Sequence, residues 1–263
     1  MNAEQHQKAS DLLWSSWHEG RKLSALPEAM RPSTREDGYA IQALLERHTS
    51  MPLFGWKIAA TSQAGQAHIG VDGPIAGRLL GEQTQHSDTS MPLMGNAMRV
   101  AEPEFAFRMA RDIEPRARAY ALDEVLDAVA TLHPAIEVPD SRYEDFVHVG
   151  AAQLIADNAC AHRFVLGPAT RANWRAIDLI EHAVVGEIAG KTRRDGRGVN
   201  VLGDPRVALT WLANELSRLS ITLLSGQVVT TGTCMVPLAV AAGDAVTADF
   251  GTLGRVSISF TAD

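Results

Sequence analysis

The pattern of apolar and polar residues changes about fifty residues into the chain. Before that point apolar residues recur at helical spacing, and Thr34 with Asp37 three residues later comes close to a capping box that starts a helix. From about residue 51 the chain consists of short β-type runs separated by Gly and Pro. We therefore predict a helical N-terminal segment over residues 1–50 and a β-rich domain over residues 51–263.

Strands and helices are interspersed in this second part. The runs with strand character are 52–61, 101–109, 133–141, 225–233, 245–250 and 254–260. The last two form a predicted hairpin around Gly251 and Gly254. The stretches with helical character are 121–132, 150–161 and 204–221, the last starting at Asp204 and Pro205. Because helices come first and mixed strands follow, the predicted fold class is α+β.

The run "AEPEFAFRM" at 101–109 places two carboxylates inside an apolar segment. In a strand, Glu102 and Glu104 share one face while Phe105 and Phe107 share the other. In a helix the two glutamates would diverge to nearly opposite sides. Pro103 cannot donate to a β-ladder, so we expect this strand to lie at a sheet edge or to be bulged at that point.

Two further segments repeat this design of a charged residue among small ones. Glu137 shares a strand face with Ala135, and Lys57 shares one with Gly55 and Ala59, while bulky residues occupy the reverse faces. Such segments would line a polar pocket. The alternative that the carboxylates form a solvated face, and that Lys57 is a surface lysine, stays open at this point.

Convergence of the carboxylates of Glu102, Glu104 and Glu137 would require a compensating charge. At about 5 Å each ionised pair would repel by roughly 3 kcal/mol at an effective dielectric of 20. Protons or a cation must offset this repulsion. An all-oxygen site of this kind suits Mg²⁺ or Mn²⁺, which keep open positions for water and substrate.

Composition narrows the classes of partner. The net charge of -7 argues against nucleic acid or an anionic membrane surface. No apolar run approaches the ~18 residues that span a bilayer, and no signal peptide opens the sequence, so we expect a cytoplasmic protein.

Cys160 and Cys234 form no disulfide framework and are predicted to be small core residues. The Gly-rich basic stretch 190–204 lacks the spacing of a phosphate-binding loop, and we expect a flexible lid or an exposed connection there.

Several long motifs occur together in a familiar order. "GWKIAATSQAGQAHIGVDGPIAGRLL", "AEPEFAF", "AIEVPDSR" and "VLGDPRVALTWLANEL" resemble the 2-keto-4-pentenoate hydratase group of the fumarylacetoacetate hydrolase superfamily, which includes 4-oxalocrotonate decarboxylases. The resemblance implies a mixed, rolled β-sheet core with flanking helices, and homo-oligomers. It also implies that Mg²⁺ or Mn²⁺ binds to Glu102, Glu104 and Glu137, and that Lys57 is catalytic or positions the substrate.

The resemblance implies a reaction as well. We expect hydration of a 2-hydroxy-2,4-dienoate to a 4-hydroxy-2-oxo acid, as in the catabolism of aromatic compounds by meta-cleavage. Hydratases of this group often carry an acidic residue where this chain has Ile75, which puts the reaction in doubt. Decarboxylation of a 4-oxalocrotonate-type acid, hydrolysis of an acylpyruvate and a non-catalytic metal-binding role therefore stay open.

The remaining candidates concern substrate binding. Backbone amides at a Gly-containing turn can hold an anion, which makes Thr231, Gly232 and Thr233 candidate carboxylate-binding residues, and the resemblance supports this role. We predict that His133 is a structural residue of its strand. A substrate tail with its own carboxylate would require a cationic contact, and the arginines considered for it are Arg78, Arg108 and Arg142.

Overall fold

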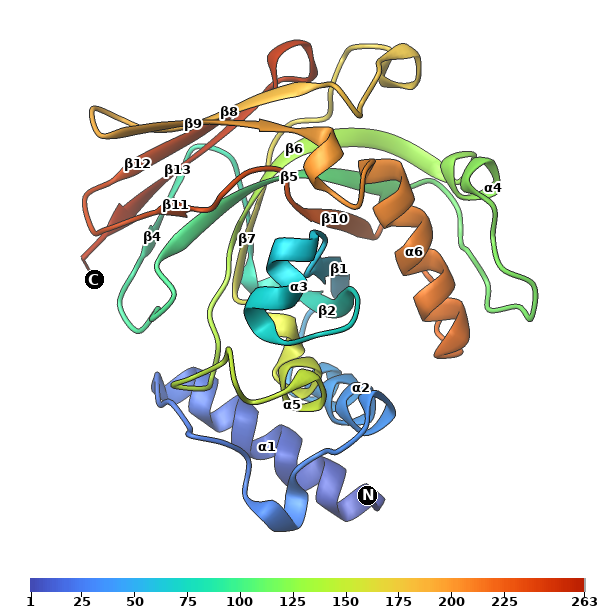
Figure 1. Cartoon of the computed structure of the whole chain (residues 1–263), viewed down its shortest axis with the longest axis vertical. Coiled ribbons are helices and arrows are strands. Elements are labelled where there is room, and N and C mark those ends of the chain that lie inside the picture. Colours follow the sequence, from blue (N-terminus) through green and yellow to red (C-terminus); the bar gives the residue numbers. More distant parts are fainter. Residues whose placement is uncertain (263) are drawn as a thin grey trace.

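The computed structural model describes residues 1–262 and combines two β-sheets with flanking helices (Figure 1). The helices are α1 (Ala3–Glu19), α2 (Arg35–Ala43), α3 (Gln63–Ile69), α4 (Leu122–Leu126), α5 (Ala151–Ala156) and α6 (Pro205–Arg218). The strands are β1 (Leu53–Ala59), β2 (Ile75–Leu80), β3 (Thr84–His86), β4 (Thr89–Pro92), β5 (Val100–Met109), β6 (Val129–Val138), β7 (Arg163–Leu166), β8 (Ala183–Ile188), β9 (Thr192–Arg197), β10 (Val228–Thr233), β11 (Leu238–Ala239), β12 (Ala245–Asp249) and β13 (Arg255–Thr261).

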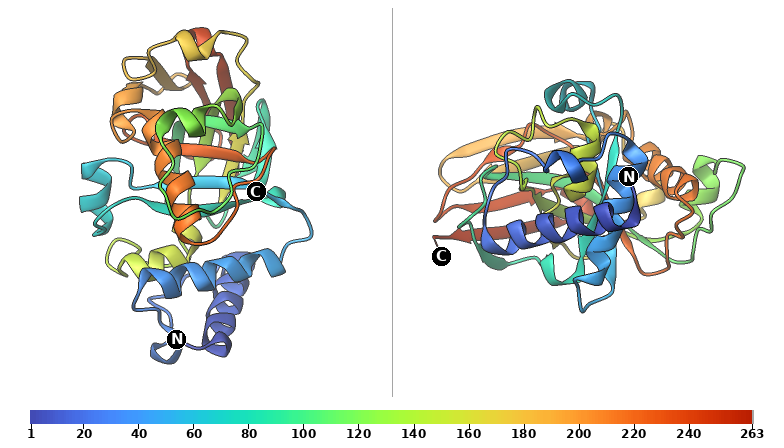
Figure 2. Two further views of the ribbon diagram at one scale, coloured as in Figure 1. Left: turned by 90° about the vertical axis from the view of Figure 1, so that its right-hand side faces the viewer. Right: turned by 90° about the horizontal axis from the view of Figure 1, so that it is seen from below.

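The larger sheet carries every strand on which a charged site residue was predicted. Its strand order is β2-β1-β10-β5-β6-β7-β3, with β11 paired to β5, and the second sheet has the order β4-β13-β12-β8-β9. Strand β1 runs parallel to β10 and antiparallel to β2, so the larger sheet is mixed. The two sheets lie above the N-terminal helices in Figure 1 and in the left panel of Figure 2. The predicted α+β class is thereby confirmed.

Aromatic packing fixes the apolar face of β5. Phe105 meets Phe250 edge to face with ring centroids 5.1 Å apart, and Phe107 meets Trp174 in the same way at 5.7 Å. Both phenylalanines on β5 are fully buried. Because side chains alternate along a strand, the glutamates of β5 point to the opposite face. The main core therefore lies on one side of the larger sheet, and the other side carries the glutamates together with a smaller apolar cluster formed by Leu79, Ala106, Ala135, Phe164, Leu166 and Val228.

Several predicted elements are confirmed. Helices α1 and α2 occupy the first fifty residues, and the Thr34 hydroxyl accepts a hydrogen bond from the Asp37 backbone N–H at 3.1 Å. Helix α6 starts at Pro205, with the Asp204 side chain as its N-cap. Strands β12 and β13 form the predicted antiparallel hairpin. Cys160 and Cys234 are both buried and free.

Two predicted helices are wrong in extent. The stretch 121–132 is helical only over α4, because β6 starts at Val129 and pairs with β5. In 150–161, helix α5 ends at Ala156, and Asn158, Ala159 and Cys160 then adopt left-handed φ angles of 55°, 51° and 60°. The side chain of Asn158 explains this break. It accepts a hydrogen bond from the Arg78 N–H at 2.6 Å and donates one to the Arg78 carbonyl at 2.8 Å, as a neighbouring strand would.

The lid or exposed connection expected at 190–204 is also wrong. Residues 192–197 form β9, an edge strand that pairs with β8 through an antiparallel register from Ala183↔Arg197 to Ile188↔Thr192. Gly190 turns the chain between the two strands with φ of +71°. Strands β2, β3, β4, β7, β8, β9 and β11 lie outside the predicted runs.

Pro103 does not mark a sheet edge. Strand β5 is interior, paired with β6 on one side and β10 on the other, so the edge alternative is wrong. The register of the β10–β5 pair shifts between Thr230, which pairs with Ala106, and Thr233, which pairs with Glu104, so a bulge in β10 lies across from Phe105. The Pro103 carbonyl accepts a hydrogen bond from the Cys234 N–H at 3.0 Å. The bulge thus lies in the partner strand β10 and not in β5 at Pro103 itself, where the missing proline N–H predicted it.

The N-terminal helices share a small core with the region around α5. This cluster consists of Ala9, Leu13, Leu26, Ile41, Tyr143 and Ala156. An ion pair between Lys22 and Asp140 joins the same two regions. The other Asp140 oxygen accepts hydrogen bonds from the N–H groups of Ala97 at 2.9 Å and Met98 at 3.3 Å. The domain boundary between residues 50 and 51 stays a prediction.

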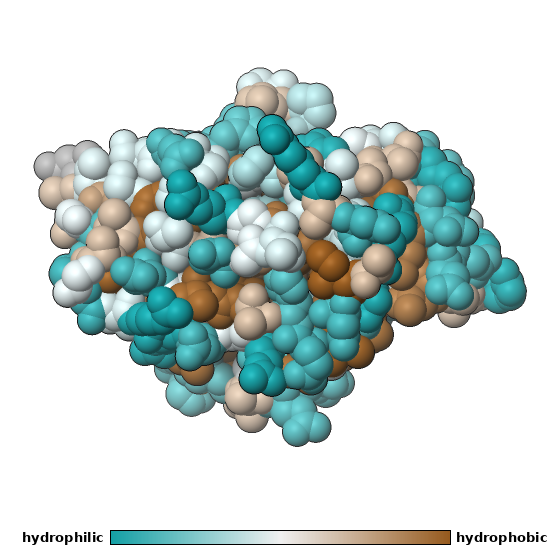
Figure 3. Space-filling model, turned by 90° about the horizontal axis from the view of Figure 1, so that it is seen from above, coloured by the Kyte–Doolittle hydropathy of each residue, from teal (hydrophilic) through white to brown (hydrophobic). Residues whose placement is uncertain are grey.

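Among the described residues, none of the helices is both long and apolar enough to cross a membrane. Figure 3 shows a face over the second sheet on which apolar residues form small patches between hydrophilic side chains. The features that call for a functional explanation lie in the interior, on the polar face of the larger sheet.

Candidate active site

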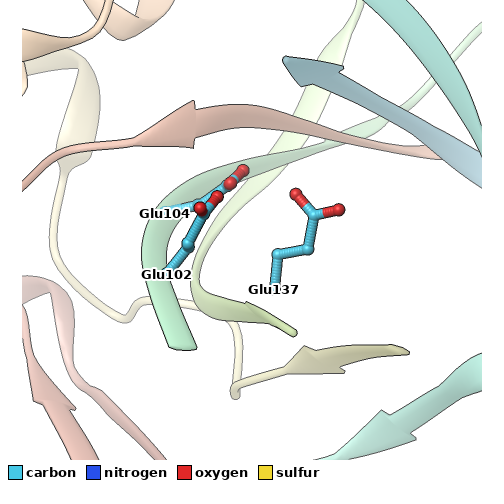
Figure 4. Close-up of side chains that lie close together, drawn as sticks. All are labelled: Glu102, Glu104 and Glu137. Carbon is cyan, nitrogen blue, oxygen red and sulfur yellow. The ribbon is translucent and has the colours of Figure 1, made fainter. Parts of the chain in front are cut away.

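The strand order β1-β10-β5-β6 brings the predicted charged residues together. Glu102 on β5 and Glu137 on β6 are direct cross-strand partners, and Glu104 lies two residues further along β5. One carboxylate oxygen from each of these three residues lies within 4.8 Å of the others. Figure 4 shows the carboxylates on β5 and β6 directed to the same side of the sheet. The alternation of residues along the predicted strands therefore assigned the three glutamates to the correct faces of the sheet.

Burial makes this cluster energetically demanding. Glu104 is fully buried and Glu137 is 1% exposed, whereas Glu102 lines a cavity. At 4.8 Å each ionised pair would repel by roughly 3 kcal/mol at an effective dielectric of 20. Glu104 Oε1 and Glu137 Oε2 make no hydrogen bond to any group in residues 1–262. Buried acceptors of this kind fit a cation, which would satisfy both the lone pairs and the charge.

The bulge in β10 holds one of the carboxylates. Glu104 Oε2 accepts hydrogen bonds from the Thr230 hydroxyl and, at 2.8 Å, from the Gly232 N–H. Gly232 has φ of +91°, a conformation that favours glycine. Its N–H is therefore directed to a side chain instead of a neighbouring strand. These two bonds fix Glu104 and leave its second oxygen free.

Lys57 is the cation beside the glutamates. Its Nζ lies 3.0 Å from Glu137 Oε1 and donates a hydrogen bond to the Ala159 carbonyl at 2.9 Å. The left-handed turn after α5 presents that carbonyl. A Cβ on Gly77, which pairs with Lys57 across β2 and β1, would lie 3.0 Å from the lysine Cδ, so glycine leaves room for the stem. An ammonium has three N–H donors, and one stays available for a ligand.

The titration of the cluster reflects burial and mutual repulsion. Burial and the charge of Glu137 raise the pKa of Glu102 to about 7. Burial and the two neighbouring carboxylates raise the pKa of Glu104 well above its ordinary range, and burial raises the pKa of Glu137 despite the opposing charge of Lys57. Burial alone would lower the pKa of Lys57, but the three glutamates outweigh it and raise that pKa. The single ammonium group of Lys57 does not balance the three carboxylates, as expected for a site that takes up a cation.

A cavity of about 1210 Å³ opens in front of Glu102 and Lys57. Apolar side chains make up much of its wall, namely Ile69, Ile75, Met98, Phe146, Leu154, Val199, Leu202 and Val236. Ile75 is 1% exposed and pairs with Ala59, so it stands on the same sheet face as Lys57. Within residues 1–262, Lys57 is the only lysine or arginine that lines this cavity. The site thus joins an ionic end to a predominantly apolar chamber.

The structure brings only part of the predicted anion-binding turn to the cavity. Gly232 and Thr233 line it, whereas the Thr231 hydroxyl donates to the Phe105 carbonyl at 3.0 Å within the sheet. His133 is a structural residue of its strand, as predicted, because its two ring nitrogens bond to the Gly167 carbonyl and the Thr131 hydroxyl. Burial lowers the pKa of His133, which favours the neutral ring.

The arginines considered for a substrate tail are engaged elsewhere. Arg78 pairs with Glu46 at 2.7 Å, and Arg142 pairs with the buried Asp157. Arg108 donates to the Gly226 carbonyl at 2.8 Å. Since none of the three lines the cavity, the structure provides no arginine for a second carboxylate there.

Sequence reasoning missed three polar groups at the site. Thr230 binds Glu104, the Ala159 carbonyl receives Lys57, and the Thr61 side chain lines the cavity. Alternation along "VVTTGT" separates Thr230 from Thr231, but only the pairing with β5 shows which of them meets the glutamate. No local signal identifies the Ala159 carbonyl, because its turn depends on the distant contact between Asn158 and Arg78.

Comparison with known proteins defines the family. The sequence profile of the fumarylacetoacetate (FAA) hydrolase C-terminal family matches residues 62–260. The chain therefore belongs to the fumarylacetoacetate hydrolase family, and its fold is the mixed, curled-sheet fold with flanking helices of that family.

Individual relatives narrow the comparison further. The chain is 33% identical over 245 residues to the 2-keto-4-pentenoate hydratase of Burkholderia vietnamiensis, covering 92% of each chain. It is 29% identical over 263 residues to the enzyme of the same name from Paraburkholderia xenovorans, covering 99% of this chain and 96% of the relative. Among solved structures, 4-oxalocrotonate decarboxylase from Pseudomonas putida, complexed with magnesium and adipate, matches with a TM-score of 0.89 and 27% identity over 99% of this chain and 98% of the other.

Proposed function

We propose that this protein is a metal-dependent hydratase that adds water to a 2-hydroxy-2,4-dienoate and forms a 4-hydroxy-2-oxo acid. The observation that carries the proposal is the position of the three carboxylates and Lys57 at one end of a chamber. Among residues 1–262, no other lysine or arginine lines this chamber. A substrate with one acidic end and an uncharged tail fits this distribution of charge. The relatives named as 2-keto-4-pentenoate hydratases support the same reaction.

Glu102, Glu104 and Glu137 would hold the cation, for which we propose Mg²⁺ or Mn²⁺. The bound cation supplies Lewis acidity that stabilises negative charge on the C2 oxygen of the substrate. The oxygen-only ligand set and the unpaired oxygens of Glu104 and Glu137 support this assignment. The solved relative complexed with magnesium supports it as well.

Lys57 would act as an ammonium group toward the acidic end of the substrate. Two of its three N–H groups are directed to Glu137 and the Ala159 carbonyl, and the third can contact the C1 carboxylate or deliver a proton. Gly232 and Thr233 also line the cavity and would shape the carboxylate pocket, although the Gly232 N–H is bonded to Glu104 and the Thr233 hydroxyl to the Met235 carbonyl. The role of Lys57 is thus to orient the substrate and to hold a proton close to it.

The reaction then proceeds in two balanced stages. In the first, the enol O–H of the dienoate loses its proton and C5 gains one, which gives a 2-oxo-3-enoate. In the second, water forms a bond to C4 through its oxygen, and C3 gains a proton. The order follows from reactivity, because a conjugated ketone accepts water whereas an isolated alkene does not.

Decarboxylation is the second candidate, because the same enolate-stabilising site would serve it. The solved relative is a decarboxylase and was complexed with adipate, a molecule with a carboxylate at each end. Among residues 1–262, no arginine and no lysine other than Lys57 lines the chamber for a second carboxylate, and Arg78, Arg108 and Arg142 are engaged elsewhere; His68 is the one further basic side chain in the wall. This feature favours hydration. We also propose, from the family, that the protein assembles as a homo-oligomer.

The test is the loss of ultraviolet absorbance of freshly generated 2-hydroxypenta-2,4-dienoate, with Mg²⁺ or Mn²⁺ and then with excess EDTA, followed by identification of the product. Metal-dependent formation of 4-hydroxy-2-oxopentanoate is the expected result and would show that Ile75 is compatible with proton transfer. Absence of conversion, together with release of CO₂ from 4-oxalocrotonate, would replace the hydratase proposal with the decarboxylase.

A further inference from the structure

Thr61 occupies the wall of the cavity just beyond the end of β1. The preceding residue, Ala60, has a left-handed φ of 59°, which is unfavourable for a residue with a Cβ. The backbone of Thr61 is fixed by its carbonyl, which accepts a hydrogen bond from the Leu202 N–H at 2.8 Å. The chain thus turns at the strained residue Ala60, and Thr61, like Lys57, lines the cavity.

The Thr61 hydroxyl has no protein partner. The residue is only 5% exposed, it lines the cavity, and its hydroxyl makes no hydrogen bond to another group of residues 1–262. The other nearby threonine hydroxyls are all engaged: Thr230 with Glu104, Thr231 with Phe105 and Thr233 with the Met235 carbonyl. A nearly buried hydroxyl that is left without a protein partner in a binding cavity is available for a ligand.

The hydroxyl also lies at the ionic end of the cavity. A Cβ on Gly232 would come within 2.1 Å of Thr61 Oγ1, so Thr61 packs directly against the glycine whose N–H holds Glu104. Thr61 is therefore close to the wall that carries Glu104. Glycine at 232 serves two purposes, because its φ of +91° aims the N–H and its missing side chain admits the hydroxyl.

We propose that the Thr61 hydroxyl binds the substrate and donates a hydrogen bond to the carboxylate of a 2-oxo acid. This inference rests on the proposed function only in taking a 2-oxo acid as the ligand. The carboxylate must lie close to three glutamates, so neutral and cationic donors are needed around it. Lys57 supplies the cationic donor, and Thr61 supplies a neutral one that can rotate toward the anion.

The experiment compares Thr61→Val, which keeps the branched shape and removes the hydroxyl, with Thr61→Ser, which keeps the hydroxyl. Binding of 2-oxopentanoate, which has no double bond to hydrate, is measured calorimetrically in the presence of Mg²⁺, alongside Mg²⁺ affinity and the melting temperature. Thr210→Val is the control for the chemical change, because the Thr210 hydroxyl donates to the Arg206 carbonyl within α6 and lies outside the cavity.

We expect Thr61→Val to weaken 2-oxopentanoate binding about 10- to 100-fold, as for loss of a hydrogen bond to a charged group. Thr61→Ser and Thr210→Val should stay within about threefold of the parent on the same scale, and Mg²⁺ affinity should not change. Equal affinities in the parent and Thr61→Val would overturn the inference, as would absence of binding in the parent. A parent that binds 2-oxopentanoate but does not hydrate the dienoate would refute the proposed function alone, and the Thr61 comparison would still decide this inference.

Discussion

Glu102 and Glu137 stand directly opposite each other on neighbouring antiparallel strands, with their side chains on the same face of the sheet. Like charges in this arrangement destabilise a sheet, and the buried Glu104 beside them adds to the repulsion. Lys57 compensates only part of this charge. The stability of the protein should therefore depend on whatever cation the three carboxylates hold.

Saturating Mg²⁺ or Mn²⁺ should raise the melting temperature, and EDTA should reverse the change. A ligand at 100 times its Kd stabilises the folded state by about 2.7 kcal/mol, which corresponds to roughly 5–10 °C for a chain of this size. Glu104→Gln should abolish this shift and reduce activity, because it removes one charge while Thr230 and Gly232 can still bond to the amide oxygen. Differential scanning calorimetry and circular dichroism provide the measurement. The exposed Glu28→Gln is the control, and full Mg²⁺-dependent turnover in Glu104→Gln would contradict the metal assignment.

Replacing Lys57 by Met should separate catalysis from metal binding. Met keeps the unbranched stem but removes the N–H groups, so kcat/KM should fall by about 10²–10⁴-fold, the range for loss of a positioned proton-transfer group. Metal affinity should be retained or increased, because a cation beside the three carboxylates is lost. Steady-state kinetics and calorimetric titration with Mn²⁺ would measure the two effects. Lys8→Met, at an exposed lysine on α1, is the control, and parallel loss of metal affinity in Lys57→Met would assign the lysine to the metal site instead.

A new cation at the cavity mouth should widen substrate choice toward dicarboxylates. Val199 is 41% exposed and lines the cavity, whereas Val207 is 44% exposed on α6 and lies outside it. We expect Val199→Arg to lower the inhibition constant of adipate by about tenfold, as for one added charged hydrogen bond, and Val207→Arg to leave it unchanged. Competition assays with the dienoate substrate would test this. Tight inhibition of the unmodified protein by adipate would show that the chamber already accommodates a charged tail.

Stability should fall in acid because of His162. Burial and the nearby Arg142 lower the pKa of this histidine to about 3, and its Nδ1 has no hydrogen-bond partner among residues 1–262. The folded protein thus keeps the ring neutral while the unfolded chain takes up a proton below about pH 6.5. The contribution of the neutral His162 to stability is fully present above that pH and is lost toward pH 3, with a slope that approaches about 1.4 kcal/mol per pH unit for this one group.

The variant His162→Phe tests this pH dependence. Phe preserves the contact with the Trp17 ring, whose centroid lies 5.7 Å from that of His162, and it cannot be protonated. Urea unfolding between pH 5 and pH 8 should show a shallower pH dependence for the variant than for the parent. His148→Phe is the control, because His148 is exposed. An unchanged slope in His162→Phe would show that protonation of His162 does not cause the acid sensitivity; the buried glutamates could not explain it either, because their raised pKa values make the folded state bind protons more readily than the unfolded chain.

Strand alternation was sufficient to predict the faces of the site. Glu102 and Glu104 were expected on one face of their strand, and Lys57 and Glu137 on the small-residue faces of theirs, because a period of two depends only on local sequence. The neighbour relations were not available in this way. Strand β10 inserts between β1 and β5 although it comes near the end of the chain, and the resemblance to a family, not the periodicity, indicated that these strands meet.

Long-range contacts explain what the sequence did not predict. The stretch ending at Cys160 has helical character, but the bonds from Asn158 to the Arg78 backbone stop the helix and create the turn that receives Lys57. The same limit applies to Thr61, since an unpaired hydroxyl can be recognised only when all its neighbours are known. Ladder pairing and side-chain satisfaction depend on the whole fold, so local propensity does not determine them.

The bonds of Asp140 tie the N-terminal helices to the catalytic sheet. Lys22 comes from the N-terminal segment, and the Ala97 and Met98 amides belong to the loop that leads into β5 and its glutamates. A single carboxylate thus connects residues 1–50 to the position of Glu102. The N-terminal segment is therefore not an interchangeable module: in a chimaera that exchanged it for that of another family member, Asp140 would keep its bonds to the Ala97 and Met98 amides but would need a cation at position 22 to keep this link to the N-terminal helices.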